Sequence, residues 1–424
     1  MKRRPLVLFG GLLLFAAWLA FLLHSCTAGP AVPPGGRLGE IVHPPVLRVG
    51  LSRCLREPSA RLAVRGPFEV RAGGELLARG EELPWTEVRA GEGIRLGEVS
   101  GGPGPLSVIP GRDGTLEVEY LRDFRGGPVV PPAVVRYRGR LLIRAAAADK
   151  LVLVNEVDLE DYLRGVVGQE MSLEEEVEAL KAQAIAARTY ALCQQRSGRL
   201  SRVRGEKFDL YDDERSQVYG GMQRETPRAS GVVDATRGLV VVYEEKLVPT
   251  FYSSACGGAT DAAWDVLGEE AGSGRLPPLG GRKCGFCERR AVHRWEAPVV
   301  VSKREISERC LPSGLRGRRI RSLEIARTLP GGRALELAVS LEGEPKAVRL
   351  PAADFRRGLV SVRLRSLLWD RIEDRGEVVA IVGRGWGHGA GMCQVGACEM
   401  ARDGRTAAEI LEYYFPGAAV RKIY

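Results

Sequence analysis

The sequence VDLEDYLRGVVGQEM at residues 157–171 decides the fold, because the chain changes there from strands to helices. Upstream, from Leu47 to about Lys150, short runs of alternating apolar and polar residues are bounded by Gly and Pro, a pattern typical of half-buried strands. Asp158 to Val167 then predicts a short helix. The boundary between a β-rich unit and a helical region therefore falls near residue 150.

A second, longer helix is predicted immediately downstream, through EALKAQAIAARTYA at residues 178–191. Ser172 followed by Glu175 is a capping-box pattern, which predicts that this helix begins there and continues to about Gln195. Apolar residues at steps of three and four predict its buried stripe: Val177, Leu180, Ala184, Ala187 and Ala191. Four polar residues border the stripe and form either a solvated edge or one wall of a groove: Lys181, Arg188, Gln183 and Tyr190.

The remainder of the chain mixes strands and helices. Thr226-Pro227 predicts a helix start with Pro at its first position, and Thr406 with Glu409 predicts a capped helix near the end. Strands are predicted at 239–243, 248–253, 320–326, 334–340 and 378–382, and a further helix at 392–402. We therefore predict an α+β protein in which a β-rich unit, residues 46–150, packs on a mixed region, residues 151–424.

The composition excludes several classes of protein. The chain has 424 residues, 45% of them hydrophobic, which excludes wholesale disorder and allows about two or three domains. Its net charge is +9, from 62 Lys and Arg against 53 Asp and Glu. No basic run alternates with aromatic residues as single-strand binders require, so we predict no nucleic-acid partner. An anionic polymer of the cell surface is compatible with this charge.

The N-terminus carries an export pattern. Lys2, Arg3 and Arg4 precede 18 uncharged, mostly apolar residues, 6–23, close to the lower limit for a membrane-spanning helix. Cys26 then ends a sequence similar to a lipoprotein cleavage box, so residues 1–26 are either an uncleaved anchor or a lipoprotein signal. Residues 27–45 are rich in Pro and Gly and predict a linker. Both alternatives place the remaining chain outside the cytoplasmic membrane, tethered to it.

Three blocks together resemble the SpoIID family, the stage II sporulation protein D group that includes amidase enhancers. The first is residues 157–191, described above. The second is FDLYDDERSQVYGG at 208–221, and the third is GRGWGHGAGMCQVGA at 383–397. Their order and spacing agree with the family, and the resemblance covers the chain from about Leu47 onward.

The resemblance implies lytic transglycosylase activity on peptidoglycan glycan strands stripped of their peptides, with Glu170 at the family's catalytic carboxylate position. In such a reaction one acid protonates the glycosidic oxygen, and the muramic acid 6-hydroxyl then closes a 1,6-anhydro ring. Burial would keep this acid protonated, whereas a nearby helix N-terminus would favour the carboxylate. The position of Glu170 alone favours a surface residue of the acidic stretch that includes residues 174–176, and only the motif favours a catalytic role.

Further residues of these blocks are candidates for substrate binding, with packing or capping as the alternative for each. Lys181 and Arg188 could hold the acidic lactyl group of muramic acid. Aromatic stacking or hydrogen bonding on sugars could come from Tyr190, Gln217, Tyr219, Trp386 and His388. The glycines around His388 would let the backbone approach a ligand closely.

Two departures from the family pattern stand out. The second block lacks the His and Cys that bind zinc in some sporulation members, so that zinc site should be absent. Ser172-Leu173 replaces the usual Pro and Trp after the catalytic Glu-Met, which changes the expected shape of this loop.

The cysteines suggest a different metal site. Cys284 and Cys287 have the C-x-x-C spacing of zinc ligands, and Cys256 and Cys393 could complete four sulfur ligands, with His293 or His388 as substitutes. Disulfides are the alternative in an exported protein. The other four cysteines are expected to be buried singly: Cys54, Cys193, Cys310 and Cys398.

No cofactor is expected for catalysis, and peptidoglycan is the expected partner at the outer face of the cell membrane. The rival interpretation is a non-catalytic peptidoglycan-binding protein that stimulates a cell-wall amidase, the N-acetylmuramoyl-L-alanine amidase. The presence of Glu170 favours the enzyme, and the altered Ser172-Leu173 loop favours the rival. A sugar-binding scaffold of the envelope is the third alternative.

Overall fold

The computed structural model describes residues 43–424 except 53–56, 103, 123–127, 148–149, 206, 269–273 and 360. The predicted anchor, Cys26, nearly all of the linker and Cys54 lie outside these residues. Among the helices that are described, none is both long and apolar enough to cross a membrane.

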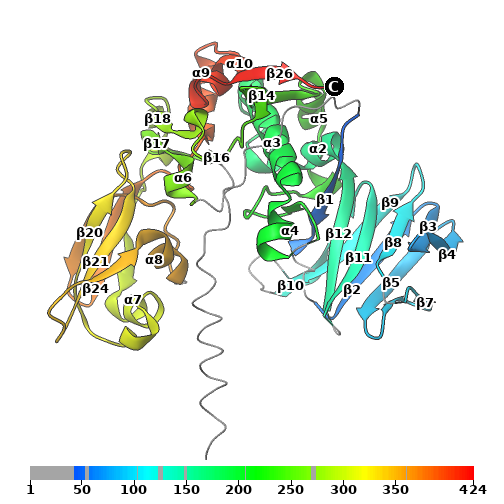
Figure 1. The fold of residues 1–424 in the computed structure, drawn as a ribbon, viewed down its shortest axis with the longest axis horizontal. Coiled ribbons are helices and arrows are strands. Elements are labelled where there is room, and N and C mark those ends of the chain that lie inside the picture. Colours follow the sequence, from blue (N-terminus) through cyan, green and yellow to red (C-terminus); the bar gives the residue numbers. More distant parts are fainter. Residues whose placement is uncertain are drawn as a thin grey trace, which may run out of the picture.

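Two antiparallel-rich sheets confirm the predicted β-rich unit (Figure 1). The seven-stranded sheet has the order β13 (Leu210–Tyr211), β1 (Val46–Gly50), β12 (Lys150–Asp158), β11 (Arg140–Ala147), β8 (Leu106–Pro110), β3 (Phe68–Ala72), β4 (Glu75–Gly80). The six-stranded sheet has the order β10 (Pro128–Tyr137), β9 (Thr115–Arg122), β2 (Ser59–Arg65), β5 (Leu83–Ala90), β6 (Ile94–Leu96), β7 (Val99–Ser100). Strand β1 pairs antiparallel with β12 and parallel with β13, so the second sequence block joins the first sheet.

A helical layer follows β12 directly. Helix α2 (Leu159–Glu170) begins at Asp158, whose carboxylate accepts a hydrogen bond from the Glu160 N–H at 2.8 Å. Helix α3 (Val177–Ser197) contacts five other elements of this layer: α2, α5 (Pro227–Ala235), α9 (Gln394–Arg402), α10 (Ala407–Tyr414) and β14 (Leu239–Tyr243). The short α4 (Arg199–Arg204) comes next in the chain. Strand β14 lies between β15 (Lys246–Leu247) and β26 (Ala419–Lys422).

Helix α3 is buried more completely than a single stripe would require. Four of the five predicted stripe residues are fully buried, but Val177 at the first position is 44% exposed. Gln183, Arg188 and Tyr190, which were predicted to border the stripe, are buried as well. The reason is that α2, α5, α9, α10 and β14 enclose the helix from several sides.

The hydrophobic residues form two main cores. One is continuous from Leu47 in β1 to Ala418 near the C-terminus, so the β-rich unit and the helical layer share it. The other begins at Trp295 and ends at Ile381. It lies under β19 (Val299–Ser302), β20 (Ile320–Thr328), β21 (Ala334–Leu341), β22 (Val348–Pro351), β23 (Leu368–Arg375), β24 (Val378–Arg384), α7 (Lys303–Arg309) and α8 (Ala352–Gly358). Figure 1 shows the strands of this second core on one side of the helical layer around α3 and the β-rich unit on the other.

Short elements connect the two cores. Strand β16 (Tyr252–Ser253) pairs in parallel with β25 (Met392–Cys393), which brings two segments together that are 140 residues apart. Strand β17 (Ala259–Asp261) pairs with β18 (Gly281–Lys283). The one-turn helices are α6 (Ala263–Val266), η3 (Gly221–Arg224), η5 (Pro277–Leu279), η6 (Cys287–Arg289), η7 (Ala291–His293) and η8 (Ser313–Leu315).

Candidate functional site

Glu170 is the last residue of helix α2, whereas the sequence predicted that this helix ends near Val167 and that Glu170 lies before the next helix start at Ser172. The predicted capping box does not form: α3 begins only at Val177, and the Ser172 hydroxyl accepts a hydrogen bond from Glu174 instead. The nearest helix terminus is therefore a C-terminus, where unpaired carbonyl groups carry partial negative charge. This end of a helix favours the protonated form of a carboxyl group, whereas the expected N-terminus would have favoured the carboxylate.

The surroundings of Glu170 hold its carboxyl in a defined place. Its Oε1 accepts a hydrogen bond from the Val218 N–H at 2.6 Å, and its backbone oxygen accepts one from the Gln394 side-chain amide at 2.8 Å. Burial raises the pKa of Glu170 to about 7, against the opposing effect of the donors Val218 and Tyr252. The side chain nevertheless keeps some exposure to solvent. This carboxyl therefore carries a proton for much of the time near neutral pH.

Tyr252 connects Glu170 to a buried hydrogen-bond chain. Its hydroxyl accepts a hydrogen bond from Gln217 Nε2 at 2.8 Å, and Gln217 Oε1 accepts one from the Tyr162 hydroxyl at 3.2 Å. Burial raises the pKa of Tyr252 far above its ordinary value, so the phenol remains protonated. With its oxygen accepting from Gln217, its own hydrogen is available for Glu170.

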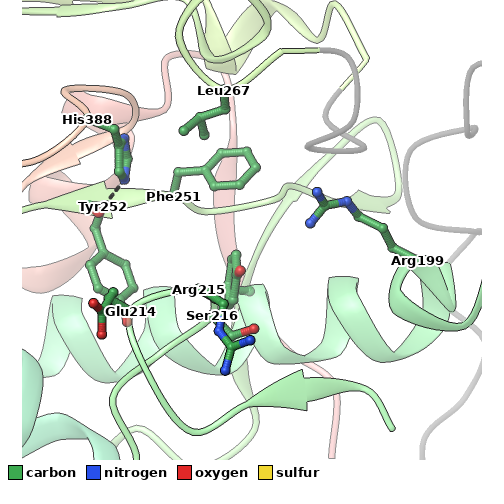
Figure 2. A pocket seen from close by; sticks show the side chains of 9 residues that line it. Arg199, Glu214, Arg215, Ser216, Phe251, Tyr252, Leu267 and His388 are labelled. Atoms are coloured by element: carbon green, nitrogen blue, oxygen red, sulfur yellow. Dashed lines mark hydrogen bonds between the residues drawn. The ribbon is translucent and has the colours of Figure 1, made fainter. Parts of the chain in front are cut away.

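A cavity of about 200 Å³ opens beside Tyr252 (Figure 2). Its walls are Tyr190, Arg199, Glu214, Arg215, Ser216, Phe251, Tyr252, Leu267 and His388. Glu170 is not one of the lining residues, but it is close enough to the Tyr190 and Tyr252 phenols for its negative charge to raise the pKa of both. The cavity therefore adjoins the Glu170 carboxyl across the Tyr252 side chain.

Two cations line this cavity and differ in their bonding. Arg215 forms an ion pair with Asp213 at 2.6 Å and lies over the Tyr211 ring at 3.7 Å from its centre. Arg199, in contrast, has a buried Nε atom for which the described residues offer no hydrogen-bond partner. Arg199 therefore brings to the cavity wall a positive charge that no described carboxylate neutralises in an ion pair.

Both ring nitrogen atoms of His388 form hydrogen bonds within the protein. Its Nδ1 accepts a hydrogen bond from the Ala390 N–H at 3.0 Å, so the ring proton is on Nε2, which donates to the Tyr252 carbonyl at 2.9 Å (Figure 2). Burial lowers the pKa of His388 to about 4, so the ring is neutral at neutral pH. The ring lines the cavity, but both its nitrogen atoms already have protein partners.

The glycines around His388 serve close packing within the protein. A Cβ atom on Gly389 would lie 2.0 Å from the Arg333 guanidinium, and one on Gly391 would lie 2.0 Å from the Phe251 carbonyl oxygen. Both glycines also have positive φ angles, 78° and 69°. The expected approach to a ligand is thus replaced at these two positions by an approach to the protein's own atoms.

The four predicted cysteine ligands come together in the core. Cys256, Cys284, Cys287 and Cys393 are all buried, and their Sγ atoms lie within 4.8 Å of one another. None of the seven cysteines in the described part of the chain is in a disulfide. His293 contacts the cluster from outside, with Nδ1 at 3.5 Å from Cys287 Sγ, whereas His388 is bonded elsewhere. The cluster could bind a structural metal such as zinc.

Comparison with known proteins identifies the family of this chain. Residues 147–243 match the family model described as SpoIID, stage II sporulation protein, and they include β12, α2, α3 and α5. The stage II sporulation protein D of Bacillus amyloliquefaciens is 29% identical over 279 residues, which cover 63% of this chain and 75% of that protein. The chain belongs to the SpoIID family.

Other relatives of this SpoIID-family protein differ in coverage. An uncharacterized protein of Brachyspira hyodysenteriae is 32% identical over 286 residues, covering 68% of this chain and 72% of that protein. The amidase enhancer of Bacillus subtilis strain 168 is 26% identical over 294 residues, covering 61% of this chain but 40% of the enhancer.

Two predicted substrate-binding residues of the SpoIID blocks are part of the core. Arg188 is fully buried and forms a two-pronged ion pair with Glu160 at 2.7 and 2.8 Å, and its remaining N–H groups meet Thr236 and backbone oxygens. The Tyr219 hydroxyl donates to Asn155 at 3.1 Å, and its ring packs on Tyr162. Neither side chain has a free face for a ligand. The prediction that Arg188 and Tyr219 bind substrate is therefore corrected to a packing role for both.

The other predicted residues lie at different distances from the cavity. Tyr190 and His388 line it, and Gln217 does not line it but donates a hydrogen bond to the Tyr252 hydroxyl. Lys181 is partly exposed and paired with Glu178 at 2.7 Å on the surface of α3. Trp386 is partly exposed, with Arg365 5.0 Å from its ring centre.

No sequence pattern pointed to four of the cavity residues: Tyr252, Arg199, Phe251 and Leu267. Three others belong to the second block that was quoted but were not singled out: Glu214, Arg215 and Ser216. Tyr252 gave no local signal, because only the pairing of β16 with β25 brings it to Glu170.

Proposed function

We propose that this SpoIID-family protein is a lytic transglycosylase that cleaves the bond between N-acetylmuramic acid and N-acetylglucosamine in peptidoglycan glycan strands. The observation that carries the proposal is Glu170, a carboxyl group with a pKa raised to about 7, fixed by Val218 beside a cavity. A general acid works best when its pKa is near the working pH.

The reaction would use this one carboxyl twice. Glu170 would first donate its proton to the glycosidic oxygen, and the bond from that oxygen to muramic acid C1 would break. The 6-hydroxyl of the same sugar would then form a bond to C1 while its proton passes to the Glu170 carboxylate. The products are a 1,6-anhydro end and a free 4-hydroxyl, and no water is consumed. Most glycosidases need a second carboxylate, whose place is taken here by the substrate hydroxyl.

The cavity supports binding of an acidic sugar. Its volume, about 200 Å³, is below the ~300–1,000 Å³ of whole-ligand sites, so it suits one part of a longer strand. The positive charge of Arg199 in the cavity wall matches the lactyl carboxylate that muramic acid exposes once its peptide has been removed. Arg199 would take the role predicted for Arg188 and Lys181, and strands free of peptides would be the preferred substrate.

The alternative is a non-catalytic protein that binds peptidoglycan and stimulates a cell-wall amidase. It is favoured by two observations: one relative is named amidase enhancer, and the cavity wall is formed by Tyr252 and Tyr190, not by Glu170 itself. Both functions place the protein in the cell envelope, outside the membrane, and both have peptidoglycan as partner.

Mass spectrometry of products from amidase-treated peptidoglycan tests the proposal. We expect anhydro-muramic ends from the wild-type protein, none from Glu170→Gln, and unchanged yield from the control Glu174→Gln, which alters an exposed residue of the same acidic stretch. Anhydro ends that persist in Glu170→Gln would exclude this residue as the acid.

Two other outcomes select other functions. Reducing muramic acid ends, lost in both Glu170→Gln and Glu214→Gln, would indicate hydrolysis by two carboxylates instead. Binding without any product, together with faster peptide release when a purified amidase is added, would establish the enhancer.

A further inference from the structure

We propose that Cys256, Cys284, Cys287 and Cys393 bind one zinc ion, and that this tetrathiolate site fixes the two segments that hold Glu170. The metal site stands independently of the chemistry at Glu170. The site is said to position a catalytic acid only because the proposed function makes Glu170 that acid, and this part of the proposal rests on the proposed function.

The distances fit a tetrahedral ion. Zinc–sulfur bonds of about 2.3 Å place the four sulfur atoms of a tetrahedron about 3.8 Å apart. Here all four Sγ atoms lie within 4.8 Å of one another, and Cys256 Sγ is 3.5 Å from Cys287 Sγ. A disulfide requires about 2.05 Å and joins only two sulfur atoms. One ion at the centre satisfies four buried sulfur atoms together.

The groups around the sulfur atoms suit thiolates. Cys393 Sγ accepts hydrogen bonds from the Cys256 N–H at 3.2 Å and the Gly396 N–H at 3.3 Å. The Tyr414 hydroxyl lies 3.2 Å from Cys284 Sγ, and His293 Nδ1 lies 3.5 Å from Cys287 Sγ. Donors of this kind surround zinc-bound cysteines, because each sulfur atom keeps negative charge after binding.

The first connection to Glu170 runs through Cys393. This residue is the N-cap of α9, and the next residue, Gln394, donates to the Glu170 backbone oxygen at 2.8 Å and to Gln183 Oε1 at 3.2 Å. A metal bond at Cys393 therefore fixes the start of α9, and with it the amide that holds the end of α2.

The second connection runs through Cys256. Four residues earlier, Tyr252 in β16 acts on the Glu170 carboxyl, and β16 pairs with β25 beside Cys393. The Val395 N–H also donates to the Ser254 oxygen at 2.9 Å. Cys256 and Cys393 thus follow or end two paired strands, and one ion between them prevents these strands from separating.

Metal analysis of the purified full-length chain tests the site. We expect one zinc per chain, loss of zinc in Cys284→Ser and Cys393→Ser, and full zinc in the control Cys310→Ser, which alters a buried cysteine of the other core. In case the serine variants do not fold, the wild-type protein is treated with a chelator and titrated with Co²⁺. A tetrahedral thiolate site gives charge-transfer bands from sulfur and intense visible bands.

The disulfide alternative has its own signature. A chain without metal whose denatured, non-reduced mass is lower by two hydrogens per bond, with these cysteines cross-linked in its peptides, would overturn the proposal. A chain with free thiols that takes up neither Zn²⁺ nor Co²⁺ would overturn it as well.

Hydrogen–deuterium exchange tests the positioning separately from activity. Removal of zinc is expected to speed exchange in residues 167–175 and 250–258 and to leave residues 334–341 of the second core unchanged. Unchanged exchange at 167–175 in a zinc-free but folded protein would overturn the positioning. If exchange responds as expected but no glycan product forms, the proposed function fails and the zinc site remains.

Discussion

Two influences on Glu170 oppose its ionisation: burial of the carboxyl group, and the C-terminal end of α2. A group of this kind is protonated below its pKa and loses its proton above it. The cleavage rate is therefore expected to be constant below about pH 7 and to fall about tenfold per pH unit above it. Initial rates of anhydro-end formation across pH 5 to 9 measure this profile. A rate that instead rises through pH 7 would mean that Glu170 acts first as a base.

Tyr252 offers a way to move that profile. Its hydroxyl stabilises the Glu170 carboxylate and so opposes the rise in the pKa of Glu170. Tyr252→Phe removes this donor, and the fall in rate is expected to shift to higher pH, whereas the surface variant Tyr243→Phe is expected to leave it in place. The shift is measured from the same rate profile, and a shift to lower pH would contradict the hydrogen bond.

At the level of the elements, capping patterns predicted one helix start and failed at another. Thr406 and Glu409 form both hydrogen bonds of the box at α10. At α3 the equivalent residue, Glu175, does not form the capping box, because its carboxylate pairs with Arg290 at 2.9 Å and Arg402 at 3.3 Å. Both arginines come from distant parts of the chain, so a local pattern carries no information about them.

The buried pair of Arg188 and Glu160 links α3 to α2. Removing one partner leaves an uncompensated charge inside the protein, and Arg188→Ala is expected to lower the free energy of unfolding by about 3–5 kcal/mol. Arg421→Ala breaks an exposed pair with Glu245 and is expected to cost less than about 1 kcal/mol. Urea unfolding of both variants measures the difference. Equal losses would mean that the buried pair adds nothing beyond a surface pair.

For the molecule as a whole, the sequence predicted the β-rich unit, the α+β class and the sulfur cluster, but not the second core. The cluster was predictable because C-x-x-C spacing and thiol chemistry leave few partners for four buried sulfur atoms. The second core was not, because its strands resemble those of the first, and only packing shows that Trp295 and Ile381 belong together. The cavity likewise depends on residues from α3, α4, the second block and β16 that meet only in the fold.

The charge of the whole chain gives a further expectation. With a net charge of +9 and Arg199 in the cavity, retention on peptide-free glycan is expected to weaken as ionic strength rises from about 0.05 M to about 0.5 M. Co-sedimentation with amidase-treated peptidoglycan at graded salt measures this effect. Arg199→Gln is expected to flatten the salt dependence, and retention that is insensitive to salt would point to binding through stacking alone.

The pairing of distant strands has a consequence for how the protein matures. Strand β1 needs β12 and β13 on either side, β14 needs β26, and Cys393 follows Cys287 by 106 residues. The ribosome synthesises these partners in order, so β14 stays without β26, and Cys256, Cys284 and Cys287 stay without Cys393, until most of the chain has been made. During that interval the nascent chain exposes thiols and an unpaired strand edge, so its folding is expected to be sensitive to the local redox balance.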